Sequence, residues 1–139
     1  MKKVQSWLIA CICLLCFSCK KYVQQQEQKE ALSIMTDGQW YVSGYLQNDS
    51  DITASFSGYL FKFDADNTVT ATNGSLSAAG QWSDNIAART ITTDFPGAST
   101  PLVNLNEIWK ITDSYPDSVA AKSTDTVRHT SNFLQLKKQ

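Results

Sequence analysis

All four cysteines of the chain lie close together, at positions 11, 13, 16 and 19 of the stretch CICLLCFSC. Clustered thiols are typical of zinc or iron–sulfur sites, or of disulfide frameworks in exported proteins. A metal site needs thiolates on a folded scaffold, whereas these alternate with Ile, Leu and Phe, and the single histidine, His129, is far along the chain. We therefore predict no metal centre here and interpret Cys11, Cys13 and Cys16 as small apolar residues.

Few other residues could carry out catalysis. Asp125, His129 and Ser131 have the residue types of a triad, but they lie together in the polar stretch STDTVRHTSN (123–132). Neighbours in one loop do not supply the geometry of nucleophile, base and orienting acid. We interpret His129 as a solvent-exposed loop residue, and since no carboxylate pair or glycine-rich phosphate loop stands out, we expect no enzymatic activity and no cofactor.

DADNT (64–68) has oxygen-bearing side chains at alternate positions, as at the start of a calcium loop. An EF-hand requires Gly at the sixth place and Glu at the twelfth, where this chain has Val69 and Ser75. Asp and Asn also favour turns for backbone reasons. The stretch is therefore predicted to be a hairpin turn, with no metal bound.

The apolar context of the cysteines is typical of an export signal. Lys2 and Lys3 give a positive start, and the eleven residues from Trp7 to Phe17 are apolar or small. A charged start, a short apolar core and a small residue before the cleavage point are the parts of a signal peptide. Eleven apolar residues are too few for a membrane span, which needs about 20. We predict a signal peptide over residues 1–18.

The junction Ser18–Cys19 resembles the lipobox of bacterial lipoproteins, although Cys16 stands where that family usually has Leu. The resemblance implies that the leader is removed and that Cys19 becomes an N-terminus carrying fatty acyl chains such as palmitate. Two or more chains suffice for stable attachment. A plain secreted protein cut nearby and an uncleaved anchor are the alternatives.

The resemblance also implies an address, a bacterial outer membrane or cell envelope. Lys20 and Lys21 follow the cysteine, where surface-export signals of similar lipoproteins are usually acidic. This favours the periplasm-facing side. The motifs DSV (117–119) and DTV (125–127) match a short O-glycosylation pattern of such lipoproteins at close to chance frequency, so glycosylation of Ser118 or Thr126 stays open.

The chain expected after processing is one thiol-poor, weakly acidic domain. Removing residues 1–18, which include Lys2 and Lys3, leaves 121 residues, one cysteine, and 10 basic against 13 acidic residues, a net charge of −3. The domain can have no internal disulfide and depends on its hydrophobic core. The basic residues are scattered rather than gathered in a stripe, so no nucleic-acid partner is expected.

Residues 19–36 are predicted to be the lipid anchor followed by a spacer or short helix, with docking of that helix over one end of the domain as the alternative. From residue 37 to 139, short alternating runs between turn residues predict strands. The predicted strands are 38–46, 58–64, 68–73, 76–83, 89–95, 105–112, 118–122 and 132–138. DADN (64–67) and NGS (73–75) are predicted hairpin turns.

Eight strands in a meander without helical crossovers favour antiparallel pairing and closure into a barrel, with a sandwich as the alternative. The alternation predicts a set of inward side chains, namely Trp40, Val42, Tyr59, Phe61, Phe63, Val69, Ala71, Trp82, Ile91, Phe95, Trp109, Ile111, Leu134 and Leu136. So many large rings favour a filled interior, with a small cleft at an open end as the alternative.

Several stretches together resemble the small lipocalin-like lipoproteins of Gram-negative bacteria. They are the G-x-W of residues 38–40, the FSCKK junction, the GYLFKFDADNTVTAT hairpin, GQW (80–82), LNEIWKI and LQLKK. The resemblance covers nearly the whole processed chain and implies an eight-stranded lipocalin-like barrel with a helix near one end. The family's activity is largely undefined, and this chain lacks the later lipocalin signatures of ligand transport.

We therefore predict a lipid-anchored envelope protein that acts by binding a small apolar ligand or an envelope protein. The candidate barrel-lining or ligand-binding residues are Trp40, Tyr59, Phe61, Phe63, Trp82 and Trp109. The alternative is an accessory subunit of an envelope complex with a filled core and no ligand. It would use an outer apolar patch predicted at Tyr41, Tyr45, Ile108 and Phe133.

Overall fold

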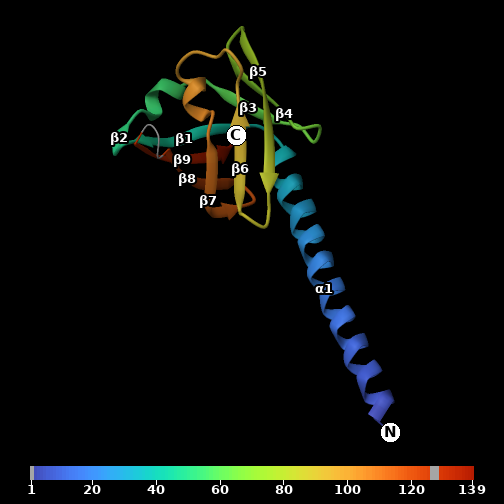
Figure 1. Ribbon diagram of the computed structural model, residues 1–139. Helices are drawn as coiled ribbons and strands as arrows, with labels where there is room; N and C mark the ends of the chain where they lie inside the picture. Colours follow the sequence, from blue (N-terminus) through green and yellow to red (C-terminus); the bar gives the residue numbers. More distant parts are fainter. Residues whose placement is uncertain (1, 126–128) are drawn as a thin grey trace.

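The computed structural model describes the main chain of residues 2–125 and 129–139 and the side chains of residues 19–124 and 129–139. Helix α1 (Lys2–Thr36) precedes a β domain (Figure 1). The strands are β1 (Trp40–Gln47), β2 (Ser50–Asp51), β3 (Leu60–Phe63), β4 (Thr68–Asn73), β5 (Leu76–Asn85), β6 (Thr90–Asp94), β7 (Ile108–Tyr115), β8 (Ser118–Asp125) and β9 (Thr130–Lys138). Two short 3-10 helices, η1 (Thr53–Phe56) and η2 (Leu102–Leu105), lie in the connections.

The strands form a closed antiparallel barrel. Consecutive strands from β3 to β9 pair in order, and β1 pairs with both β3 and β9, which closes the ring. β2 pairs only with β1, so the barrel itself has the eight strands that the sequence predicted. The predicted turns at DADN and NGS also lie where expected, between β3 and β4 and between β4 and β5.

The two ends of the barrel differ. At the first, which we call the helix end, α1 leads into β1 beside the last residues of β9, and the β5–β6 turn lies at the same end (Figure 1). At the opposite end, which we call the capped end, η1 and η2 bury Phe56, Leu102 and Leu105 against the core. The two 3-10 helices thus cover the capped end, and an opening of the barrel can lie at the helix end, beside α1.

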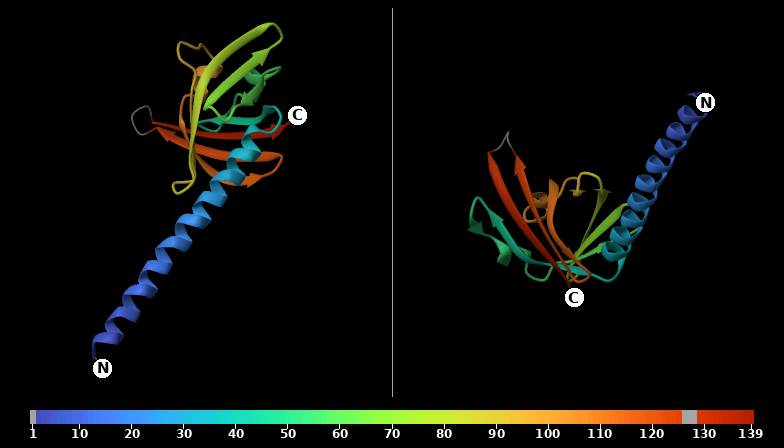
Figure 2. Two further views of the ribbon diagram at one scale, coloured as in Figure 1. Left: turned by 90° about the vertical axis from the view of Figure 1, so that its right-hand side faces the viewer. Right: turned by 90° about the horizontal axis from the view of Figure 1, so that it is seen from below.

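Helix α1 is in part a docked element. Met35 in its last turn is only 4% exposed, and Leu32 and Ile34 pack against the core. Residues 19–30 are exposed, and the helix projects well beyond the barrel (Figure 2). The last turns of α1 are therefore docked on the barrel, and the described residues before them are helical and exposed. All described core residues lie between Met35 and Leu136, so residues 20–139 contain every described residue of the core.

In the described part of the chain, no helix combines the length and hydropathy that a membrane crossing would require.

The prediction for Tyr45 was wrong. It was placed on the outer face, but its side chain is 0% exposed and lies in the core. Val42 pairs with Leu136 whereas Gly44 pairs with Gln135, so β1 has one extra residue at this point. Such a β-bulge shifts the alternation by one, which turns Tyr45 inward. The predicted outer patch therefore loses this residue, although Ile108 is 64% exposed as expected.

Other boundaries also shift. β7 begins at Ile108 rather than at residue 105, because residues 102–105 form η2, in which Leu102 and Leu105 point into the core at a spacing of three. The extra strand β2 follows a turn at Asn48 and Asp49, which both have positive φ, of 51° and 65°.

Eleven of the predicted inward side chains are buried, and the remaining three, Tyr59, Ile91 and Ile111, are half-buried against the core.

Candidate functional site

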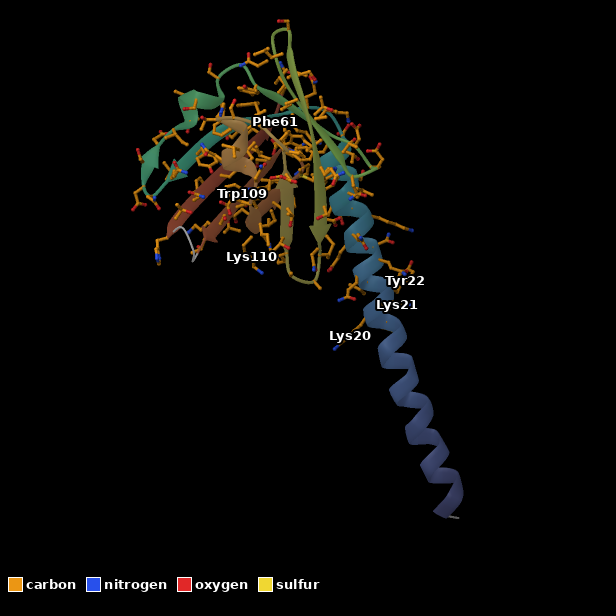
Figure 3. All side chains as sticks on the ribbon, turned by 45° about the horizontal axis from the view of Figure 1, so that its top comes forward. Lys20, Lys21, Tyr22, Phe61, Trp109 and Lys110 are labelled. Atoms are coloured by element: carbon orange, nitrogen blue, oxygen red, sulfur yellow. The ribbon has the colours of Figure 1, made fainter. Side chains whose placement is uncertain are left out.

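The barrel interior is filled. It retains a cavity of about 30 Å³ with an almost wholly apolar lining, far below the roughly 300–1,000 Å³ of a ligand pocket. The candidate residues Trp40, Phe61, Phe63, Trp82 and Trp109 are buried there, and Tyr59 is half-buried at the margin. Figure 3 shows Phe61 and Trp109 among the side chains that crowd the barrel. The prediction of a filled core is confirmed.

The polar atoms of the large rings are already used within the protein. The indole N–H groups of Trp40, Trp82 and Trp109 donate to the carbonyl oxygens of Met35, Asp64 and Leu105, at 2.9, 2.9 and 3.0 Å. These indoles are thus core residues with satisfied hydrogen bonds rather than donors held ready for a ligand.

Tyr45 is likewise structural. Its hydroxyl donates to the carbonyl oxygen of Asn104 at 2.7 Å, and its ring stacks on Phe56 and meets Trp109 edge-on. Burial raises the pKa of Tyr45, and the Glu107 carboxylate raises it further. The phenol therefore stays protonated and keeps its hydrogen bond.

The main hollow lies at the helix end, between the last turns of α1 and the rims of β5, β6, β7 and β8. We call it the helix-end groove, and its volume of about 470 Å³ is within the range of small-molecule sites. Its residues are Glu27, Glu30, Ala31, Leu32, Ile34 and Met35 on α1, and Trp82, Asp84, Asn85, Ile86, Arg89, Thr90, Ile91, Ile111, Ser114 and Val119 on the barrel.

The α1 wall of the groove follows from helical spacing. Glu27, Glu30, Ala31 and Ile34 recur every three or four residues, which places them on one face. Along this face the side chains change from acidic, further from the barrel, to apolar, next to it. The helix thus presents a polar rim and an apolar base to the same hollow.

The floor of the groove is also the roof of the interior cavity. Met35, Ile91, Ile111 and Val119 line both spaces. Met35 comes from the helix and the other three from the barrel, so the packed thioether side chain separates the groove from the core.

The barrel wall contributes an unusual carboxylate. On β5 the inward positions are Gly80, Trp82 and Asp84, and Asp84 pairs with Ile91 on β6. The Oδ2 atom of Asp84 is buried and has no hydrogen-bond partner. The sequence predicted a cleft at an open end of the barrel only as an alternative and did not include Asp84 in it, although an acidic residue in phase with Trp82 on an inward face was a signal in the sequence.

The other sequence candidates do not assemble into a site. His129 is exposed, and the main-chain N–H of Ser131 donates to Asn48 Oδ1 at 2.9 Å. The Asp125 side chain lies outside the described residues, as does most of the DTV motif at 125–127, including Thr126. Ser118 is half-buried at the start of β8.

In the part of the chain that the structure describes, no three His, Cys, Asp or Glu side chains gather closely enough to hold a metal. In the DADN turn, Asp66 Oδ1 instead accepts hydrogen bonds from the N–H and hydroxyl of Thr68, at 3.0 and 2.6 Å.

Cys19 is a free, exposed thiol on α1. Lys20, Lys21 and Tyr22, next along the helix, are exposed and lie on the part of α1 that projects beyond the barrel (Figure 3). This end of the described side chains is thus sterically free for modification.

Comparison with known proteins finds a similarity in fold. No family model matches the chain, and no curated protein matches it. Among solved structures, a DUF4847 family protein from Bacteroides vulgatus is similar, with a TM-score of 0.55 and 17% sequence identity over 78% of this chain and 99% of that one. At this level of identity the similarity establishes a shared barrel fold and nothing about activity.

Proposed function

We propose that this chain is a lipid-anchored binding protein of the bacterial cell envelope, without catalysis, that takes a small ligand with an apolar body. The ligand would bind in the helix-end groove rather than inside the barrel. The observation that carries the proposal is the contrast between a groove of about 470 Å³ with an apolar floor and an interior cavity of about 30 Å³.

The proposed anchor is acylated Cys19. Its support is the export-signal pattern of residues 1–18, the Ser18–Cys19 junction, and the exposure of the thiol on the projecting helix. A periplasm-facing position, suggested by Lys20 and Lys21, belongs to the same proposal.

We also propose kinship with the lipocalin-like lipoproteins. It is supported by the closed barrel with a helix at one end and by the place of Trp40. This residue of the G-x-W motif is fully buried at the start of β1, with Lys138 Nζ 5.3 Å from its ring centroid.

The alternative of an accessory subunit is less favoured. The outer patch that it would use was predicted to include Tyr45, which lies in the core, and Phe133, which is half-buried. Tyr41 and Ile108 alone do not form the contiguous apolar surface that a protein interface requires.

The proposal that the ligand binds in the groove is tested by filling the groove with a larger side chain. In residues 20–139, Ala31→Phe would place a ring on the α1 wall, and Ala54→Phe makes the same change at an exposed position of η1. We expect decanol to bind the unaltered domain and the Ala54→Phe variant, measured by calorimetry, and to bind Ala31→Phe at least about tenfold more weakly. Equal binding by both variants would contradict the groove as the site.

The anchor is tested separately with the full chain. We expect the wild-type protein to incorporate labelled palmitate and to sediment with membranes, and the Cys19→Ala variant to do neither. A variant that is still cleaved before residue 19 and still sediments with lipid would contradict acylation at this position.

A further inference from the structure

The helix-end groove has an excess of negative charge. Glu27 and Glu30 line it from α1 and Asp84 lines it from β5, whereas Arg89 is the one basic residue in its lining. The ion pairs between described residues, Lys62–Asp64 and Lys138–Asp37, involve none of these three carboxylates. A groove whose charges are unbalanced in this way is complementary to a cation.

Asp84 carries most of this argument because of where its carboxylate lies. It occupies an inward position of β5, next to Ile91 and in line with Trp82, where strand alternation ordinarily places an apolar residue. Its Oδ2 atom is buried without a partner. A buried acceptor without a donor is costly, and a charged one especially so.

Several nearby donors of the protein are used elsewhere. Lys110 Nζ donates to the carbonyl oxygen of Ala88, the N–H of Ala88 donates to Asn85 Oδ1, and the Trp82 indole donates to Asp64. A ligand that brings its own N–H donor would therefore satisfy Asp84 without disturbing these bonds.

We infer that the ligand of the helix-end groove is an amphipathic amine, with its ammonium group against the Asp84 carboxylate and its apolar chain over Met35, Ile111 and Val119. This inference rests on the proposed function and specifies its ligand class. A polar polyamine would leave the apolar floor uncovered, a neutral lipid would bring no positive charge to Asp84, and an anionic lipid would be repelled by it. An ammonium supplies three donors and a compact charge, which suits a half-buried carboxylate in a groove that Glu27 and Glu30 also line.

The test uses three probes with one chain and three head groups: decylamine, decanol and decanoate. Binding of each to residues 20–139 is measured by calorimetry at neutral pH, below the concentration at which the probes self-associate. We expect decylamine to bind about tenfold more tightly than decanol, because only the amine forms a charge-assisted hydrogen bond with Asp84, and we expect decanoate, which carries a like charge, to bind most weakly.

Variants then test whether Asp84 causes the preference for decylamine over decanol. Asp84→Asn should reduce the preference for decylamine over decanol from about tenfold to about twofold, with decanol affinity unchanged. Asp94→Asn, an identical change at an exposed residue of the neighbouring strand, should keep the wild-type ratio. Glu30→Gln, at an exposed position on α1, should reduce the preference by about twofold, and thermal unfolding verifies that each variant is folded.

The outcomes separate the inference from the proposed function. Equal binding of decylamine and decanol by the wild-type domain, tightest binding of decanoate, or an undiminished preference in Asp84→Asn would overturn the inference and leave the groove as an apolar site. If none of the three probes binds, the proposed function fails as well.

Discussion

The indole Nε1 of Trp40 donates a hydrogen bond to the main-chain carbonyl of Met35 at a distance of 2.9 Å. Carbonyl groups in the last turn of a helix have no partner within the helix. This bond therefore joins the end of α1 to the start of β1, five residues later, and both residues are buried. It fixes the helix over the barrel and thereby holds one wall of the groove in place.

Trp40→Phe should loosen this junction while it keeps an aromatic ring in the core. We expect the free energy of unfolding to fall by about 1–3 kcal/mol, since a buried carbonyl loses its donor and the smaller ring leaves space. Amide hydrogens of residues 31–36 should exchange faster, as measured by mass spectrometry. Trp109→Phe, which removes a similar bond at the capped end, is the control and should leave exchange in the helix unchanged.

Met35→Ala should join the groove to the interior cavity, because Met35 lines both. We expect a loss of about 2–5 kcal/mol in the free energy of unfolding and a shift of ligand preference from ten-carbon towards longer alcohols. Leu102→Ala should destabilise the domain comparably at the capped end without that shift. An unchanged chain-length preference in Met35→Ala would show that the thioether is not the partition.

Gly80→Ala should be strongly destabilising. A Cβ atom at Gly80 would lie 2.5 Å from the carbonyl oxygen of Asp94 and 2.7 Å from Phe95 Cδ1, so the neighbouring strand must move. We expect a loss of about 1–3 kcal/mol or more, measured by urea unfolding. Gly44→Ala is the matched control, because its Cβ would meet Gln135 at an ordinary 3.5 Å, and its effect should stay within about 0.5 kcal/mol.

The Asp66 turn should give a pH-dependent contribution to stability. The side-chain and main-chain hydrogen bonds from Thr68 lower the pKa of Asp66 below its ordinary value of 3.8. A carboxyl group whose folded pKa is depressed stabilises the folded state fully above its ordinary pKa, and this contribution is lost as the pH falls through the depressed value. Asp66→Ala should therefore lower Tm at pH 7, and the difference from wild type should shrink as the pH falls below 3.8.

That shrinking difference distinguishes the Asp66 hydrogen bonds from a general effect of charge. Asp94→Ala removes an exposed carboxylate on β6 and is the control. Its Tm difference from the wild-type protein should be small at every pH. A constant difference for Asp66→Ala across the titration would contradict a role for the ionised carboxylate in this turn.

Local patterns predicted the parts of the fold that depend on neighbouring residues. Phe61 and Phe63 are buried because a strand alternates its faces, and the NGS turn follows from the backbone freedom of Gly74, whose φ is 59°. Tyr45 escaped this reasoning because its direction depends on a bulge, which is set by pairing with Leu136 and Gln135 at the far end of the chain.

The lining of the groove could not be predicted from local sequence patterns, for a related reason. It forms only when the helix containing Glu27 and Ile34 docks beside the end of β5 with Asp84 and the turn with Arg89, and periodicity does not position one element against another. The barrel-lining candidates were correctly expected to be large and inward, but their size is what fills the interior and moves the available space to the helix end.

The straight course of α1 also orients the groove. From residue 19 to residue 36 the helix rises about 26 Å at 1.5 Å per residue, and the β5–β6 turn points towards the same side as its N-terminal part (Figure 1). With acyl chains at Cys19, the opening would look down towards the bilayer surface across a gap of fixed height. An amphiphile leaving the headgroup layer would then meet the acidic rim before the apolar floor, so the lipid leaflet itself would be the reservoir from which this protein is loaded.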